Sequence, residues 1–123
     1  MNRKKQDFLS ITDLSQKEVL EILQLAQKLK NELKSKADMR ATLKNKTLIM
    51  MFEKPSLRTR LSFEVGMTQL GGHAVYLGPS DIGLGVRESV ADIATVASRM
   101  GDLIMARVFR HDTVVELAKH SLV

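Results

Sequence analysis

The sequence predicts an α/β fold in which a parallel sheet carries helices on both of its faces. Three short apolar segments have strand character, at 47–52, 73–77 and 103–108, and a segment with helical character follows each of them. Strands that alternate with helices form parallel sheets with right-handed crossovers, and the helices cover the two faces. With 123 residues, the chain is long enough for one domain with a single core.

The elements of the first half are predicted from apolar spacing and helix-capping residues. A helix is expected from Ser15 to about Lys36, because apolar residues recur in it every three or four positions. Ser15 and Glu18 have the spacing of a capping box. A polar connector at 37–46 leads to the first strand. The following helix is expected to be amphipathic over 61–70, and two glycines end it.

The second half continues the alternation. The segment 78–81 is expected to form a turn, and Ser89 is expected to start a helix that stops at Gly101. Asp112 is expected to cap the last helix. The final residues, 122–123, have the character of the opening of a fourth strand, so we expect the chain to be the front part of something longer or one piece of a split protein.

Composition excludes several classes of function. The net charge of +5 lies largely at the N-terminus and on the first helix, and one Tyr and four Phe give few stacking platforms, so no nucleic-acid partner is expected. Without cysteine there is no disulfide or thiolate zinc site, and the three histidines lack metal-ligand spacing. No apolar run approaches membrane-spanning length. We expect a soluble, cytoplasmic protein.

The segment 53–60, between the first strand and the second helix, predicts an anion site. Strand, short turn and helix aim free backbone N–H groups at an anion. Ser56 and Thr59 add hydroxyls, and Arg58 and Arg60 add guanidinium groups that suit a phosphate. A plain helix cap would explain Ser56, but not two arginines in the first turn, where the helix dipole disfavours cations.

Arg107 is a second candidate for ligand binding. It falls near the end of the third strand, and ligands of parallel sheets bind at the carboxyl ends of strands. The alternative is an edge-strand residue that points to solvent. The segment 83–88 lacks the third glycine of a dinucleotide loop and follows a turn, so it is rejected as one, and no Walker A pattern occurs.

These motifs resemble the carbamoyl-phosphate site of the ornithine carbamoyltransferases. The resemblance rests on Phe-Glu-Lys-Pro-Ser-Leu-Arg-Thr-Arg at 52–60, on Gln-Leu-Gly-Gly-His at 69–73 and on Arg107, in the order of the family, and it covers nearly the whole chain. The aspartate carbamoyltransferases share the Ser-x-Arg-Thr-Arg core. The lead-in Phe-Glu-Lys-Pro and the second run are more similar to the ornithine branch.

The resemblance implies a role for individual residues. Those that it assigns to carbamoyl phosphate are Ser56, Leu57, Arg58, Thr59 and Arg107, with Lys54 and Arg87 as further candidates. Arg58 and Arg107 are the implied catalytic residues, and Arg60 is expected to brace the turn. The implied reaction is attack of the ornithine δ-amine on the carbamoyl carbon, which gives citrulline and phosphate. It needs no metal or organic cofactor.

The sequence departs from the family at two positions, one of which lies in a loop that implies a partner subunit. The family has Thr where this chain has Leu57, and many relatives have Gln where it has Gly83, in a loop that reaches a neighbouring subunit's site. Arg87 is the cation of that loop that could replace the contact. A homo-oligomer based on a trimer is expected.

The resemblance further implies which part of an enzyme is present. Residues 1–123 are expected to form a carbamoyl-phosphate-binding domain that is incomplete at its C-terminal end. The second domain, which binds ornithine, is missing from the sequence, so the chain alone is expected to be inactive. The alternatives are a non-catalytic fragment that binds phosphate or carbamoyl phosphate, and the aspartate branch.

Overall fold

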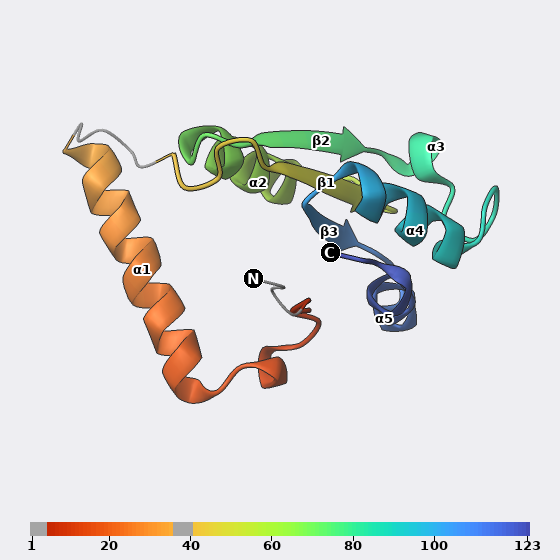
Figure 1. The fold of residues 1–123 in the computed structure, drawn as a ribbon, viewed down its shortest axis with the longest axis horizontal. Helices are drawn as coiled ribbons and strands as arrows, with labels where there is room; N and C mark the ends of the chain where they lie inside the picture. The colour runs from red at the N-terminus through yellow and green to blue at the C-terminus, as the bar shows by residue number, and fades with distance from the viewer. Residues whose placement is uncertain (1–4, 36–40) are drawn as a thin grey trace. The chain divides into compact units, whose positions relative to one another are not determined.

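The computed structural model describes residues 5–35 and 41–123, and the chain divides into two compact units (Figure 1). The unit Asp7–Arg40 contains a short 3-10 turn, η1 (Ile11–Asp13), and the helix α1 (Gln16–Lys34). The capping box predicted at the start of α1 is confirmed, because the N–H of Ser15 donates to the Glu18 carboxylate at 2.7 Å and Ser15 Oγ accepts the N–H of Glu18. The predicted helix end at Lys36 and part of the predicted connector, 37–40, lie outside the described residues.

The second unit, Met1–Gln6 with Ala41–Val123, contains a three-stranded parallel sheet, and we call it the sheet unit. Its strands are β1 (Thr47–Phe52), β2 (His73–Leu77) and β3 (Leu103–Arg107), and their order in space is β2-β1-β3. The central strand β1 is buried from Leu48 onward, since strands flank it on both sides and helices cover both faces. The predicted parallel sheet is confirmed.

Each face of the sheet carries its own apolar core. On one face, Met67 of α2 (Leu57–Gln69) packs against alternate residues of β1, namely Leu48, Met50 and Phe52. On the other face, residues of α4 (Val90–Met100) and α5 (His111–His120) pack against Ile49 and Met51. Because successive strand residues point to opposite faces, β1 serves both cores. The prediction of helices on both faces is therefore confirmed.

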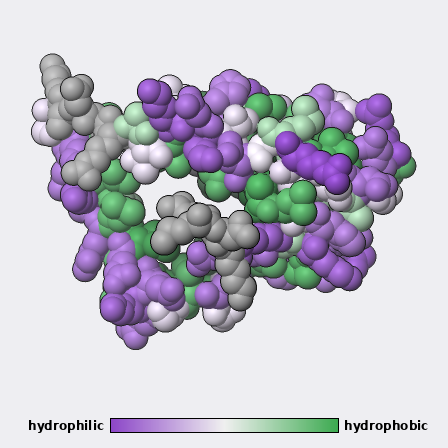
Figure 2. Space-filling view, in the orientation of Figure 1, coloured by the Kyte–Doolittle hydropathy of each residue, from purple (hydrophilic) through white to green (hydrophobic). Residues whose placement is uncertain are grey.

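The prediction that the second helix is amphipathic is wrong. Met67 is its buried residue, whereas Leu57, Leu61 and Val65 are exposed. These three lie four residues apart and share one side of α2, and Met67 lies about 120° around the helix from Leu61, the middle residue of the three. Figure 2 shows apolar residues among the polar ones on the face of the molecule that it displays.

Two local predictions in the second half are also corrected. The segment predicted as a turn at 78–81 is mostly a short helix, α3 (Pro79–Ile82), because proline at the first position suits a helix start. The last helix begins at His111 with Arg110 as its N-cap, so Asp112 lies inside the first turn and pairs with Arg110 at 2.8 Å instead of capping.

The last residues of the chain differ from their predicted structure. Residues 122–123, predicted to open a fourth strand, are not in a strand in this structure. Within 5–35 and 41–123, no helix combines the length and apolar character needed to cross a membrane.

Candidate functional site

The predicted anion turn lies where β1 ends and α2 begins. Ser56 is the N-cap of α2, with extended backbone angles of φ −159° and ψ 110°. Its hydroxyl donates to the Thr59 hydroxyl at 2.9 Å and accepts the N–H of Thr59 at 3.4 Å. Ser56 and Thr59 therefore close the first turn of the helix on each other, as a capping pair does.

The N-terminus of α2 leaves hydrogen-bond donors free. Among the described residues, the N–H groups of Leu57 and Arg58 have no acceptor, and the exposed Arg58 guanidinium has no protein partner. Free N–H groups at a helix start carry a partial positive charge, so an adjacent arginine costs free energy unless an anion offsets it. This combination is what a phosphate-sized anion would satisfy.

Arg60 is directed away from this role. Its Nε donates to the Glu64 carboxylate at 3.2 Å, one helical turn further along α2. Its guanidinium carbon lies 3.9 Å from the centre of the Tyr76 ring on β2, a cation–π contact that joins α2 to the sheet. The geometry agrees with the expectation that Arg60 braces the turn, and it leaves Arg58 as the free guanidinium of the turn.

Arg107 lies on the same face of the sheet as α2. It is the register partner of Phe52 across the parallel β1–β3 pair, and Met105, two residues earlier, packs in the core under α2. Since residues two apart in a strand share a face, Arg107 also projects on the α2 side, at the edge where α2 begins. The residue is half-buried, and its Nε is a buried donor without a partner among the described residues. The structure thus brings the turn and Arg107 to one end of one face.

The sequence of residues 6–123 matches the family model described as aspartate/ornithine carbamoyltransferase, carbamoyl-P binding domain. The chain belongs to the aspartate/ornithine carbamoyltransferase family. The resemblance derived from the motifs at 52–60 and 69–73 is confirmed by this match and by the relatives described next.

Similar proteins come from distant organisms. The chain is 49% identical over 117 residues to the chloroplastic ornithine carbamoyltransferase of Pisum sativum, covering 95% of the chain and 31% of that protein. It is 51% identical over 118 residues to the putrescine carbamoyltransferase of Mycoplasma capricolum, covering 96% and 32%. The structure of ornithine carbamoyltransferase from Pyrococcus furiosus matches with a TM-score of 0.92 at 46% identity, covering 96% of this chain and 37% of that one. The chain spans about a third of the length of the curated relatives that it matches.

In this chain, hydrogen bonds join the segments that follow β1 and β3. The N–H of Glu53 donates to the carbonyl of Arg107 at 2.9 Å, and the Glu53 carboxylate accepts the N–H of Phe109 at 2.7 Å. Lys54 places its ammonium 5.3 Å from the centre of the Phe109 ring. Lys54 is thus directed to the segment that follows Arg107. Sequence reasoning missed Glu53 and Phe109, because their contact joins positions 56 residues apart.

The remaining predicted residue, Arg87, folds back on its own loop. Its Nη1 donates to the carbonyl of Ser80 in α3 at 3.2 Å. Its side chain lies across Gly83, which has a left-handed backbone at φ 46°. The expectation that Arg87 reaches a neighbouring subunit's site stays a prediction.

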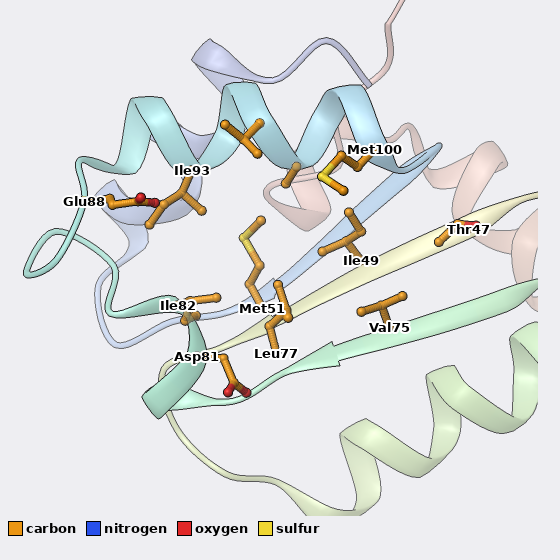
Figure 3. Close-up of a pocket in the computed structure, with 12 residues that line it drawn as sticks. Thr47, Ile49, Met51, Val75, Leu77, Asp81, Ile82, Glu88, Ile93 and Met100 are labelled. Atoms are coloured by element: carbon orange, nitrogen blue, oxygen red, sulfur yellow. The ribbon is translucent and has the colours of Figure 1, made fainter.

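The sheet unit also has an apolar pocket on the opposite face of the sheet. Figure 3 shows Ile49, Met51, Val75 and Leu77 projecting from the strands toward α4. The pocket that they line has a volume of about 350 Å³. Asp81 and Glu88 are the acidic residues in its lining, which is otherwise almost entirely apolar. Because Arg107 shares the other face with α2, this pocket is separate from the anion turn.

Proposed function

We propose that this chain supplies the carbamoyl-phosphate site of an ornithine carbamoyltransferase. The observation that carries the proposal is the set of unsatisfied donors at one end of the sheet. These are the N–H groups of Leu57 and Arg58, the Arg58 guanidinium and the buried Nε of Arg107. Buried and helix-terminal donors are normally satisfied, so a set of them at one edge calls for an acceptor.

The proposed chemistry follows from the charge of these donors. The amides at the start of α2, with Ser56, Thr59 and Arg58, would hold the phosphate of carbamoyl phosphate. Arg107 would donate to the phosphate and to the carbamoyl oxygen. When a neutral amine attacks the carbamoyl carbon, negative charge grows on that oxygen and on the departing phosphate. Fixed donors stabilise both charges without reorganising, which lowers the barrier.

The acceptor amine is the finer part of the proposal. Ornithine is proposed because the lead-in at 52–55 and the run at 69–73 are more similar to the ornithine branch than to the aspartate branch. The putrescine carbamoyltransferase among the relatives makes putrescine the competing amine. The pocket for the amine is proposed to come from a second domain, so the chain alone is expected to be inactive. Its cytoplasmic location and its part in arginine metabolism stay predictions.

We further propose that the site works in a homo-oligomer, based on a trimer as the resemblance implies. Two apolar surfaces of the sheet unit, which no described residue covers, support this. One is the exposed row of Leu57, Leu61 and Val65 on α2, which we call the α2 row. The other is the apolar pocket beside α4 on the opposite face. An exposed row on one copy and a pocket on the next would give a head-to-tail contact, which forms a ring when the rotation between copies closes.

Charge complementarity favours the same pairing. Arg58 follows the first residue of the α2 row, whereas Asp81 and Glu88 lie in the lining of the pocket. A row that carries a cation would therefore meet a pocket that carries anions, which favours this register over others. The pairing would also place Glu88 of one copy near the turn of another.

A complementation assay tests the proposed reaction. The chain is mixed with a separately expressed C-terminal domain of a similar ornithine carbamoyltransferase, and carbamoyl phosphate is supplied with ornithine, putrescine or aspartate. We expect citrulline from the mixture, none from either part alone, and none when the chain carries Arg58→Ala. Preferential carbamoylation of putrescine or aspartate would assign the chain to another branch of the family. Rapid citrulline formation by the chain alone would contradict a site built from two domains.

A further inference from the structure

We propose that Glu53 is a positioning residue that holds Arg107 at the carbamoyl-phosphate site. The inference rests on the proposed function, since Arg107 needs to be positioned only where it has a ligand. Glu53 makes two hydrogen bonds to the segment 107–109, one from its N–H to the Arg107 carbonyl and one to its carboxylate from the Phe109 N–H. A single residue therefore holds this three-residue segment at both ends.

The location of this contact explains why it is needed. The pairing of β1 with β3 ends at Phe52 and Arg107, so the bond from the Glu53 N–H extends the ladder by one step. Beyond it, the chain turns toward α5, whose N-cap Arg110 makes no side-chain capping bond. The 2.7 Å bond from Phe109 to a carboxylate is of the short, charge-assisted kind and fixes the turn where the ladder can no longer do so.

Arg107 has little else to fix it. Its Nε has no partner among the described residues, so the side chain takes its direction from the backbone that carries it. A rotation of the 107–109 segment would swing the guanidinium away from the start of α2. The Lys54 ammonium on the Phe109 ring adds a second contact from the same turn to the same segment. Both contacts come from the two residues that directly follow β1.

Because Glu53 is charged, the direction in which substitutions change phosphate affinity can test this role. A carboxylate three residues before Ser56 repels an anion bound at the turn, so its charge opposes ligand binding. Its oxygen, in contrast, helps binding by holding Phe109. Gln keeps an acceptor oxygen and removes the charge, whereas Ala removes both. A positioning role therefore predicts opposite effects of the two substitutions, and a purely electrostatic role predicts the same effect.

The experiment measures phosphate binding to the 123-residue chain by calorimetry at low ionic strength. We expect Glu53→Ala to weaken binding about tenfold, the scale of one charge-assisted hydrogen bond. We expect Glu53→Gln to bind phosphate more tightly than the unsubstituted chain. Glu116→Ala removes the same charge from an exposed position on α5 and should leave binding unchanged. In the ¹⁵N spectrum, Glu53→Ala should shift and deprotect the Phe109 amide while the Met50 amide stays protected.

The possible outcomes separate this inference from the proposed function. Equal weakening by Glu53→Ala and Glu53→Gln, or a Phe109 amide that is unchanged in Glu53→Ala, would overturn the positioning role. Unchanged phosphate binding in Arg107→Ala would instead contradict the proposed site itself. If Glu53→Ala does not fold, Glu53→Asp takes its place, because a side chain one methylene shorter also loses the Phe109 bond and should weaken binding.

Discussion

The side chain of Arg87 lies against the α-carbon of Gly83, in the space that a side chain at position 83 would occupy. A β-carbon built on Gly83 would be 2.8 Å from Arg87 Cδ and 2.9 Å from Cγ. The carbonyl of Gly83 accepts the N–H groups of Val86 and Arg87, and the guanidinium donates to Ser80. Glycine at 83 and the folded-back Arg87 are therefore one structural feature, and the departure from the family at 83 has a consequence at 87.

Substitution of this glycine tests the loop. Gly83→Ala introduces a β-carbon at φ 46° and forces Arg87 to move, so we expect it to lower the free energy of unfolding by about 1–2 kcal/mol. Gly66→Ala is the matched control, because nothing lies within 4 Å of its β-carbon inside α2. That change should raise stability by about 0.5–1 kcal/mol. Urea unfolding measures both, and equal effects would refute the role of Gly83.

Removal of the free guanidinium of the turn should weaken anion binding. Arg58→Ala is expected to reduce the binding free energy for phosphate by about 1.5–3 kcal/mol, the scale of a hydrogen bond to a charged group. Arg99→Ala removes the same charge from the last turn of α4, so it controls for net charge. Calorimetry measures the phosphate affinity of both variants. Equal phosphate affinities of Arg58→Ala and Arg99→Ala would exclude Arg58 from the site.

Stability toward acid should depend on Asp102, which joins the starts of β1 and β3. Its carboxylate accepts from Lys46 Nζ at 2.7 Å and from the Thr47 N–H at 2.9 Å. These bonds, that of Lys46 first, hold the pKa of Asp102 below its ordinary value. A carboxyl with a lowered pKa in the folded state stabilises above its unfolded pKa, and this contribution is lost as the pH falls through the folded value.

The variant Asp102→Asn measures that contribution. In unfolding experiments between pH 6 and pH 3, the unsubstituted chain should lose more stability than the variant, mainly below about pH 4. The variant should also be less stable at neutral pH, because it loses the ion pair with Lys46. Parallel stability curves for the two chains would show that Asp102 does not carry the acid sensitivity.

The proposed oligomer can be tested on the α2 row. Leu61→Glu places a charge in the middle of the row, which should convert the oligomer to monomer, because a buried unpaired charge costs several kcal/mol. Val115→Glu, at a similarly exposed apolar position of α5, should leave the oligomeric state unchanged. Sedimentation analysis gives the mass of each. A Leu61→Glu chain that keeps the mass of the unsubstituted chain would rule out this surface.

Much of the fold could be predicted because its signals are local. The run at 47–52, which is buried from Leu48 onward, contains six consecutive residues without a charge. Ser15 with Glu18 and Ser89 with Asp92 mark helix starts by spacing alone. Capping and apolar periodicity act within a few residues, so they can be recognised from the sequence alone. The amphipathic prediction for 61–70 failed because α2 has apolar residues on two sides, and periodicity cannot say which of them the sheet covers.

The sequence by itself determined that a turn with Ser56, Arg58 and Thr59 opens a helix after a buried strand, and that Arg107 ends another strand. Only the tertiary structure decided which partner each charged side chain contacts. It directs Arg60 to Tyr76, and it directs both Lys54 and Glu53 to Phe109. It turns Arg87 back to Ser80, and it gives Arg58 no partner within the part of the chain that the structure describes. The physical reason is that a charged side chain takes the partner that the fold brings near it, and strands 56 residues apart in the chain become neighbours only when the sheet forms.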